Sequence, residues 1–127
     1  MDSAGAKKLV DRYIAAYNAF DIDGMLVLLS PDIRFENHSG DQPATATTGI
    51  DEFRQLAQQS KTLFSEREQR VAALRIGQDS AIADIAFRGV LAADVPGGPA
   101  AGTVLELQGT SEFTFDDGRI ARIVDRS

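Results

Sequence analysis

The sequence contains no cysteine, and this absence excludes disulfide bonds, thiol nucleophiles and thiolate metal sites. It also contains only one histidine, His38. A lone histidine without clustered carboxylates does not give the ligand spacing of a known metal site. We therefore expect a protein that works without a metal ion or a cofactor.

Basic stretches and long apolar runs are also missing. Lys7-Lys8 is the only basic doublet, and the formal net charge is −6, so no face suits nucleic acid or an anionic membrane. The longest strongly apolar run, Met25–Leu29, is far shorter than the roughly 20 residues of a membrane span. No apolar signal core follows Lys7-Lys8. We expect a cytoplasmic protein with neither a nucleic-acid nor a membrane partner.

What the sequence does contain is the composition of an ordinary folded domain. Of its 127 residues, 43% are hydrophobic and 25% are charged. This length is sufficient to bury a core and is typical of one domain. We therefore treat residues 1–127 as a single domain.

The first half of the chain has the pattern of helices. Apolar residues recur at three- and four-residue spacing within Leu9–Tyr17, which predicts an amphipathic helix. Asp21 can cap a second helix that contains Met25–Leu29, and Pro31 is expected to end it. Thr48-Gly-Ile-Asp51 resembles a capping box and predicts the start of a third helix.

The remainder has the pattern of strands joined by turns. In the first strand, Ile33, Phe35 and Asn37 share one face and His38 lies on the other. Residues Gly40–Thr48 are rich in turn formers and are predicted to be a loop. Later strands are predicted at Glu68–Ile76, Ser80–Ala93, Thr103–Phe115 and Arg119–Asp125, with a loop at Asp94–Gly102 and a hairpin turn at Asp116–Gly118.

The clearest alternation lies in Thr103–Phe115, which predicts a half-buried antiparallel strand. Early helices followed by a run of strands indicate an α+β fold. We expect a curved antiparallel sheet that forms a cone, with about three helices on its concave face. Because Gly109 is small and Ser111 is polar on the inward face, the interior of this cone is not expected to be solidly packed.

Three segments resemble a known family: Asp11–Gly24, Ser30–Asn37 and Glu112–Ile123. With the order of the elements, they resemble the nuclear transport factor 2-like superfamily of cystatin-like cones, in particular its SnoaL-like and ketosteroid isomerase branch. The resemblance covers essentially the whole chain and implies a pocket for a small hydrophobic molecule and a homodimer formed through the sheet. It is specific for the fold rather than the reaction, because this fold has many functions.

The ketosteroid isomerase machinery is only partly retained. Its helix tyrosine matches Tyr13, its base aspartate falls on Asn37, and its late acid falls on Ser111. An amide has no useful basicity, so Asn37 cannot replace the base. Epoxide hydrolases of this fold use a tyrosine and an asparagine, of which Phe35-Glu-Asn37 retains only the asparagine.

SnoaL-type cyclases rely on a histidine and an aspartate, and His38 and Asp125 are the pair that the resemblance offers here. Their side-chain directions are open. An exposed His38 agrees best with its strand parity, and both faces of the last strand are apolar, so that a surface or salt-bridged Asp125 is favoured over an inward one.

The candidate residues form two sets. The catalytic candidates are Tyr13, Asn37, His38, Ser111 and Asp125, and the ligand-lining candidates are Tyr17, Phe35, Phe53, Phe87, Leu107 and Phe113. They predict an isomerase-, cyclase- or dehydratase-type enzyme that acts on a hydrophobic carbonyl compound. The alternatives are a non-catalytic protein that binds a hydrophobic ligand and a dimeric scaffold domain.

Overall fold

The computed structural model describes residues 1–127 and contains three helices and six strands. The helices are α1 (Ser3–Asn18), α2 (Ile22–Leu26) and α3 (Ile50–Lys61). The strands are β1 (Leu29–His38), β2 (Thr45–Thr48), β3 (Phe64–Ile76), β4 (Ser80–Leu91), β5 (Val104–Asp116) and β6 (Arg119–Arg126). None of the helices is long and apolar enough to cross a membrane.

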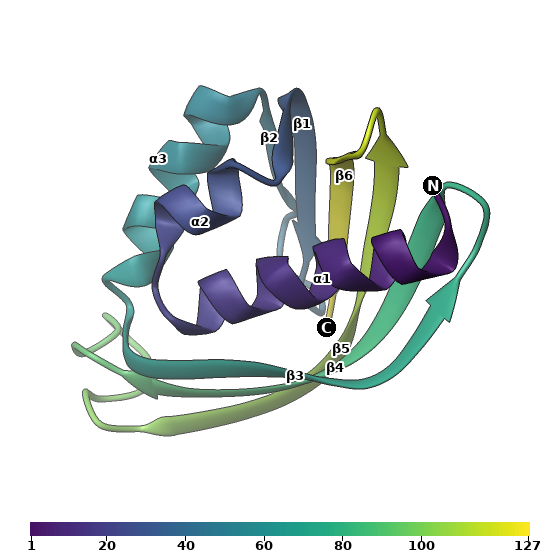
Figure 1. The fold of residues 1–127 in the computed structure, drawn as a ribbon. Coiled ribbons are helices and arrows are strands. Elements are labelled where there is room, and N and C mark those ends of the chain that lie inside the picture. Colours follow the sequence, from purple (N-terminus) through teal and green to yellow (C-terminus); the bar gives the residue numbers. More distant parts are fainter.

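The strands form one curved, unclosed sheet in the order β2-β1-β6-β5-β4-β3. All neighbouring pairs are antiparallel except β1 and β6, which run parallel. Helix α1 crosses the concave side of the sheet, and α3 lies beside β1 and β2 (Figure 1). The predicted α+β class, with a curved sheet and three helices, is confirmed.

The core lies between α1 and the inner face of the sheet. Helix α1 begins where the Asp2 carboxylate accepts a hydrogen bond from the Gly5 N–H, an N-cap that its sequence permits. Four of its residues at helical spacing are buried: Ala6, Val10, Tyr13 and Ile14. The sheet contributes the fully buried side chains Ile33, Phe113, Ile120 and Ile123. Burial of this apolar surface fixes the position of α1 over the sheet.

The second helix is shorter than the sequence predicts. The Asp21 carboxylate accepts a hydrogen bond from the Gly24 N–H, as expected for a cap, but the helix ends at Leu26. Pro31 therefore does not end it and instead lies inside β1. Pro31 lies between Leu29 and Arg34, two residues that pair with β6, and the ladder with β6 is irregular between them. A proline is tolerated there because no regular ladder bond is lost.

Two further boundaries differ from the prediction. Thr45–Thr48 within the expected loop forms β2, a short edge strand paired with β1, in agreement with the β-propensity of threonine. The N-cap of α3 is Gly49 rather than Thr48, and no side chain caps it. The predicted capping box does not form, and instead the Glu52 carboxylate accepts a hydrogen bond from the N–H of Thr48, the residue before the cap.

The β5–β6 hairpin agrees with its prediction. Asp117 and Gly118 both have positive φ values, 52° and 74°, as a two-residue turn of the primed type requires. In the middle of β5, a Cβ atom at Gly109 would collide with the carbonyl oxygen of Arg126. Glycine at this position therefore allows the last residues of the chain to pack closely against β5.

Candidate functional site

A cavity of about 430 Å³ lies between the helices and the inner face of the sheet. Its wall includes residues of α1, α3 and every strand of the sheet. The wall is largely aromatic and aliphatic, and a smaller set of its side chains has polar groups suited to chemistry: Tyr13, Tyr17, Asn37, Arg67, Gln69, Ser111 and Asp125. Such a lining, apolar with a few converging polar groups, is typical of small-molecule sites.

Strand register brings three of the candidate residues into one row. Asn37 on β1 lies directly beside Asp125 on β6, and Asp125 lies opposite Ser111 on β5. Residues in register on neighbouring strands point to the same face of a sheet. All three line the cavity, so residues that are far apart in the sequence form one polar row inside the cone.

Asp125 is the only acidic residue in the cavity wall. Its Oδ1 atom accepts a hydrogen bond of 2.6 Å from the Ser111 hydroxyl. Burial raises the pKa of the Asp125 carboxyl from 3.8 to about 6, and the hydrogen bond from Ser111 opposes this rise. A carboxyl group with this pKa can both accept and release a proton near neutral pH. The sequence favoured a surface or salt-bridged Asp125, and that interpretation is wrong.

Tyr13 is buried on α1, and its ring packs edge-to-face on Phe113, with 5.9 Å between ring centroids. Its hydroxyl lines the cavity and makes no hydrogen bond with the protein. Burial, followed by the nearby Asp125 charge, raises the pKa of Tyr13 well above 10.0. Tyr13 is therefore a neutral hydrogen-bond donor at physiological pH, with its donor free for a ligand.

The Asn37 amide also has no protein partner and lines the cavity. An amide can donate to a ligand oxygen and accept from a ligand hydroxyl. Because Asn37 lies next to Asp125 in the polar row, both side chains can contact one bound molecule.

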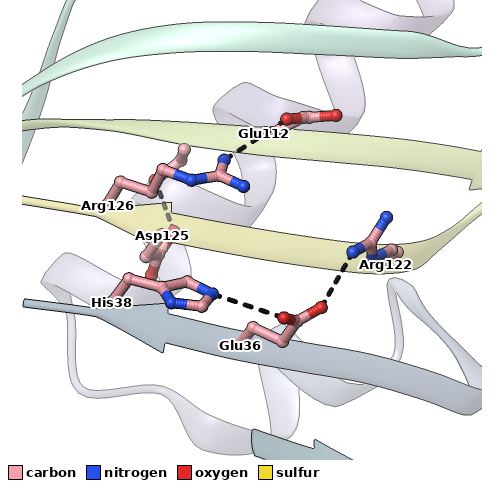
Figure 2. Close-up of polar contacts among 7 residues, drawn as sticks. Glu36, His38, Glu112, Arg122, Asp125 and Arg126 are labelled. Atoms are coloured by element: carbon pink, nitrogen blue, oxygen red, sulfur yellow. Dashed lines mark hydrogen bonds and ion pairs between the residues drawn. The ribbon is translucent and has the colours of Figure 1, made fainter. Parts of the chain in front are cut away.

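His38 lies apart from these residues. It is adjacent to Asn37 on β1 but points to the opposite face, as its strand parity predicts, and it does not line the cavity. Its Nε2 atom is 3.3 Å from Glu36 Oε1, and Arg122 donates to Glu36 at 2.8 Å. Figure 2 shows His38 and Arg122 on either side of Glu36, with Arg126 directed toward Glu112 on the neighbouring strand. His38 thus belongs to a group of polar contacts outside the cavity.

Most of the predicted lining residues reach the cavity. Five do so: Tyr17, Phe35, Phe53, Phe87 and Leu107. Phe113 does not, because it is fully buried beneath the Tyr13 ring. Its position on the inward face of β5 is as predicted, but its partner is the core rather than a ligand.

Among the residues of the wall that the sequence did not predict, Arg67 and Gln69 carry inward polar groups. Both lie on β3, which begins four residues earlier than the predicted Glu68. The signal that could have identified them is alternation, because Arg67, Gln69 and Val71 are the more buried residues of this stretch. No group of three or more histidine or acidic side chains lies close enough to hold a metal ion.

An α+β cone whose curved sheet and helices enclose a polar-lined cavity is the architecture of the nuclear transport factor 2-like proteins, which include ketosteroid isomerases. A family model described as a SnoaL-like domain matches residues 10–123. The chain belongs to the SnoaL-like family.

Several solved structures share this fold. A candidate polyketide cyclase from Xanthomonas campestris pv. campestris is 24% identical with a TM-score of 0.83, over 98% of this chain and 90% of that chain. A candidate polyketide cyclase from Pseudomonas putida is 28% identical with a TM-score of 0.72, over 92% of this chain and 86% of that chain. A protein with a ketosteroid isomerase-like fold from Catenulispora acidiphila, in complex with trimethylamine, is 12% identical with a TM-score of 0.75, over 92% and 82%.

Proposed function

We propose that this protein is an enzyme that moves a proton on a small, largely apolar carbonyl compound, as an isomerase, cyclase or dehydratase does. The observation that supports this proposal most is the Asp125 carboxyl, whose pKa is raised to about 6 and which is the single acid in the cavity wall. Perturbed carboxyl groups in clefts are common at catalytic sites.

The chemistry begins at a carbon atom next to the substrate carbonyl. The Asp125 carboxylate removes a proton from this carbon, and the electron pair of the C–H bond moves toward the carbonyl oxygen to form an enolate. The Tyr13 hydroxyl donates a hydrogen bond to that oxygen, where negative charge develops. Return of the proton from Asp125 to another carbon completes an isomerisation. Attack of the enolate carbon on a second carbonyl of the substrate closes a ring, and the alkoxide formed at that carbonyl takes the proton back from Asp125.

This scheme accounts for the amide at Asn37. The ketosteroid isomerase base matches Asn37, and Asp125 lies directly beside it in the sheet. Neighbouring strands are separated by about 4.8 Å, so the carboxylate is displaced by one strand and still lines the same cavity. Asn37 then positions the substrate rather than moving the proton.

We predict that Tyr13→Phe lowers turnover by about 10²-fold, because it removes one donor to the developing oxyanion. The protein should remain folded, since the hydroxyl has no protein partner whose loss would leave a polar group unpaired. The assay follows enone absorbance from a β,γ-unsaturated ketosteroid, with thermal melting as the folding control. Tyr17→Phe is the matched variant, with less than a tenfold effect expected. Unchanged turnover in Tyr13→Phe would remove Tyr13 from this role.

A second candidate is a carrier that binds a hydrophobic ligand without chemistry. It is favoured by Asn37 and Ser111, which stand where ketosteroid isomerases have ionisable groups. Quenching of protein fluorescence by the ketosteroid, without turnover of it or of other carbonyl compounds, would support the carrier. Turnover of any of them would exclude it.

We further propose that the protein is a homodimer formed through the outer face of the sheet. The SnoaL-like fold supports this proposal, and the outer face offers paired charges on β1, β5 and β6 for a symmetric contact. Light scattering coupled to size-exclusion chromatography should give twice the monomer mass. A monomer at concentrations of tens of micromolar would contradict the proposal.

A further inference from the structure

Arg67 is a buried cation without a carboxylate partner. It lies on β3 with 6% of its surface exposed, and its side chain reaches the cavity wall. The structure contains seven ion pairs, and Arg67 belongs to none of them. A buried charge of this kind is costly unless a partner compensates it.

The surroundings of Arg67 fix its orientation. Its guanidinium carbon lies 3.8 Å from the centroid of the Tyr17 ring and 4.5 Å from that of Phe20. Its Nε atom donates a hydrogen bond of 3.0 Å to the Tyr17 carbonyl, in the last turn of α1. No carboxylate accepts a hydrogen bond from the two terminal nitrogens, and the polar side-chain group that interacts with the guanidinium is the Tyr17 hydroxyl.

Asp125 does not neutralise this cation. No ion pair joins the two residues, and Arg67 is not among the groups that shift the pKa of Asp125. Arg126, the other basic residue of the wall, is paired with Glu112. Arg67 is therefore the one basic side chain in the wall whose charge is available to a ligand.

The side chain of Gln69, the next inward residue of β3, also lacks a hydrogen-bond partner. Its Oε1 atom is buried without a hydrogen bond. Its backbone is fixed, because Asn18 accepts from its N–H at 2.7 Å and donates to its carbonyl at 2.9 Å. The same wall thus has two adjacent inward polar side chains with unused hydrogen-bonding capacity.

We propose that Arg67, assisted by Gln69, binds a carboxylate group of the substrate. The two terminal nitrogens of a guanidinium match the two oxygens of a carboxylate. The Gln69 amide, turned so that its Nε2 faces the ligand, donates to the same anion. A single unpaired cation matches a single negative charge, whereas a phosphate monoester with nearly two charges would leave one uncompensated. This inference rests on the proposed function: it makes the substrate an acid whose reactive carbonyl is held near Asp125 and Tyr13.

The competing explanation is structural, because Arg67 also contacts the C-terminal end of α1, where a cation is favourable. The two roles predict different results. If the role of Arg67 is purely structural, its removal lowers stability and changes the affinities for acids and alcohols equally. If Arg67 binds the ligand, its removal weakens binding of acids more than binding of alcohols.

The test uses three probes of matched shape: 4-phenylbutyrate, 4-phenylbutan-1-ol and 4-phenylbutyl phosphate. Calorimetric titrations at pH 8 and low salt are expected to show the acid binding at least about tenfold tighter than the alcohol. Arg67→Met should weaken binding of the acid by about 10- to 100-fold and leave the alcohol within about threefold. Arg67→Lys should retain part of the preference. Arg75→Met, which removes an exposed arginine paired with Asp84, should change neither.

Two further measurements separate this inference from the proposed reaction and from a folding defect. Asp125→Asn should retain the preference for the acid even if turnover is lost or was never present. In the wild-type protein, ¹⁵N resonances of the Arg67 guanidinium should shift on addition of 4-phenylbutyrate and not of the alcohol. Equal binding of acid and alcohol, binding of neither, or tighter binding of the phosphate would each overturn the carboxylate assignment.

Discussion

Asp125→Asn is expected to lower turnover by about 10²- to 10⁴-fold, the usual contribution of a general acid–base group. The shape of the side chain is nearly unchanged, and its amide oxygen can still accept the hydrogen bond from Ser111. The loss therefore reports the missing proton transfer rather than a rearranged site. With the wild-type protein, turnover should rise with pH through about 6 as the Asp125 carboxyl ionises.

The same substitution is expected to stabilise the fold at neutral pH. The pKa of Asp125 rises from 3.8 to about 6 on folding, so between these values the folded state binds more protons than the unfolded state. Its contribution to the free energy of unfolding therefore falls as the pH rises through this window and stays low above it. Asparagine has no such cost, and we expect Asp125→Asn to gain about 1–3 kcal/mol at pH 8 and almost nothing below pH 4.

Urea unfolding of both proteins at pH 4 and pH 8, together with the turnover assay, measures the two effects. Asp84→Asn is the matched control, because Asp84 is exposed and paired with Arg75, and its removal should change stability by less than about 1 kcal/mol. A turnover within tenfold of the wild type would exclude Asp125 as the proton carrier. A stability difference that does not grow with pH would contradict its burial as a charged group.

Phe113→Ala is expected to reduce the free energy of unfolding by about 3–5 kcal/mol, a large share of the stability of a domain of this size. Phe113 is fully buried, and its removal would leave a cavity beneath the Tyr13 ring, which contacts it edge-to-face. Tyr13 would lose the surface that orients its hydroxyl, so turnover should fall even under conditions where the variant is folded.

Two variants bracket this effect when urea unfolding is measured at pH 7. Phe113→Leu refills part of the space and should cost less than Phe113→Ala. Leu107→Ala, six residues away on the same face of β5, should cost less than about 1 kcal/mol because Leu107 is 49% exposed. A loss below 1 kcal/mol in Phe113→Ala would show that the core under Tyr13 is not the one described.

The sequence predicted the fold well wherever one alternation runs through a whole strand. In β5 the inward set that includes Ser111 and Phe113 follows period 2 without interruption, and the structure places it as predicted. Asn37 and Ile33 on β1 likewise share the inward face. Helix α1 also followed its pattern, because its apolar stripe is the surface that the sheet buries.

The inward position of Asp125 could not be predicted, because β6 does not keep one period. A register shift between Thr114 and Phe115 changes the pairing, so Ile120 and Ile123 are both fully buried although they are three residues apart. Val124 points the other way and is buried as well, in register with Glu36 and Glu112. Because apolar residues lie on both faces of β6, the sequence pattern does not show which face of the strand points inward.

Arg67 was missed for a similar reason. Strand β3 contains register shifts between Phe64 and Glu66 and between Val71 and Ala73, so only a short stretch around Arg67 alternates regularly. Its charge also suggests a solvated position. Only the three-dimensional packing of β3 under the end of α1 shows that the guanidinium is covered by Tyr17 and Phe20.

A second row of residues lies beside the polar row that crosses β1, β6 and β5, two positions away along the same strands. There Phe35, Ile123 and Phe113 are in register, and two of them are fully buried core residues. The two rows are separated by two residues, about 7 Å. The polar groups proposed to contact the substrate and the buried side chains that form the core therefore fall on separate layers of the same strands. A lineage can exchange Asn37 or Ser111 for other groups while the hydrophobic layer persists, which gives one scaffold access to new chemistry through single substitutions.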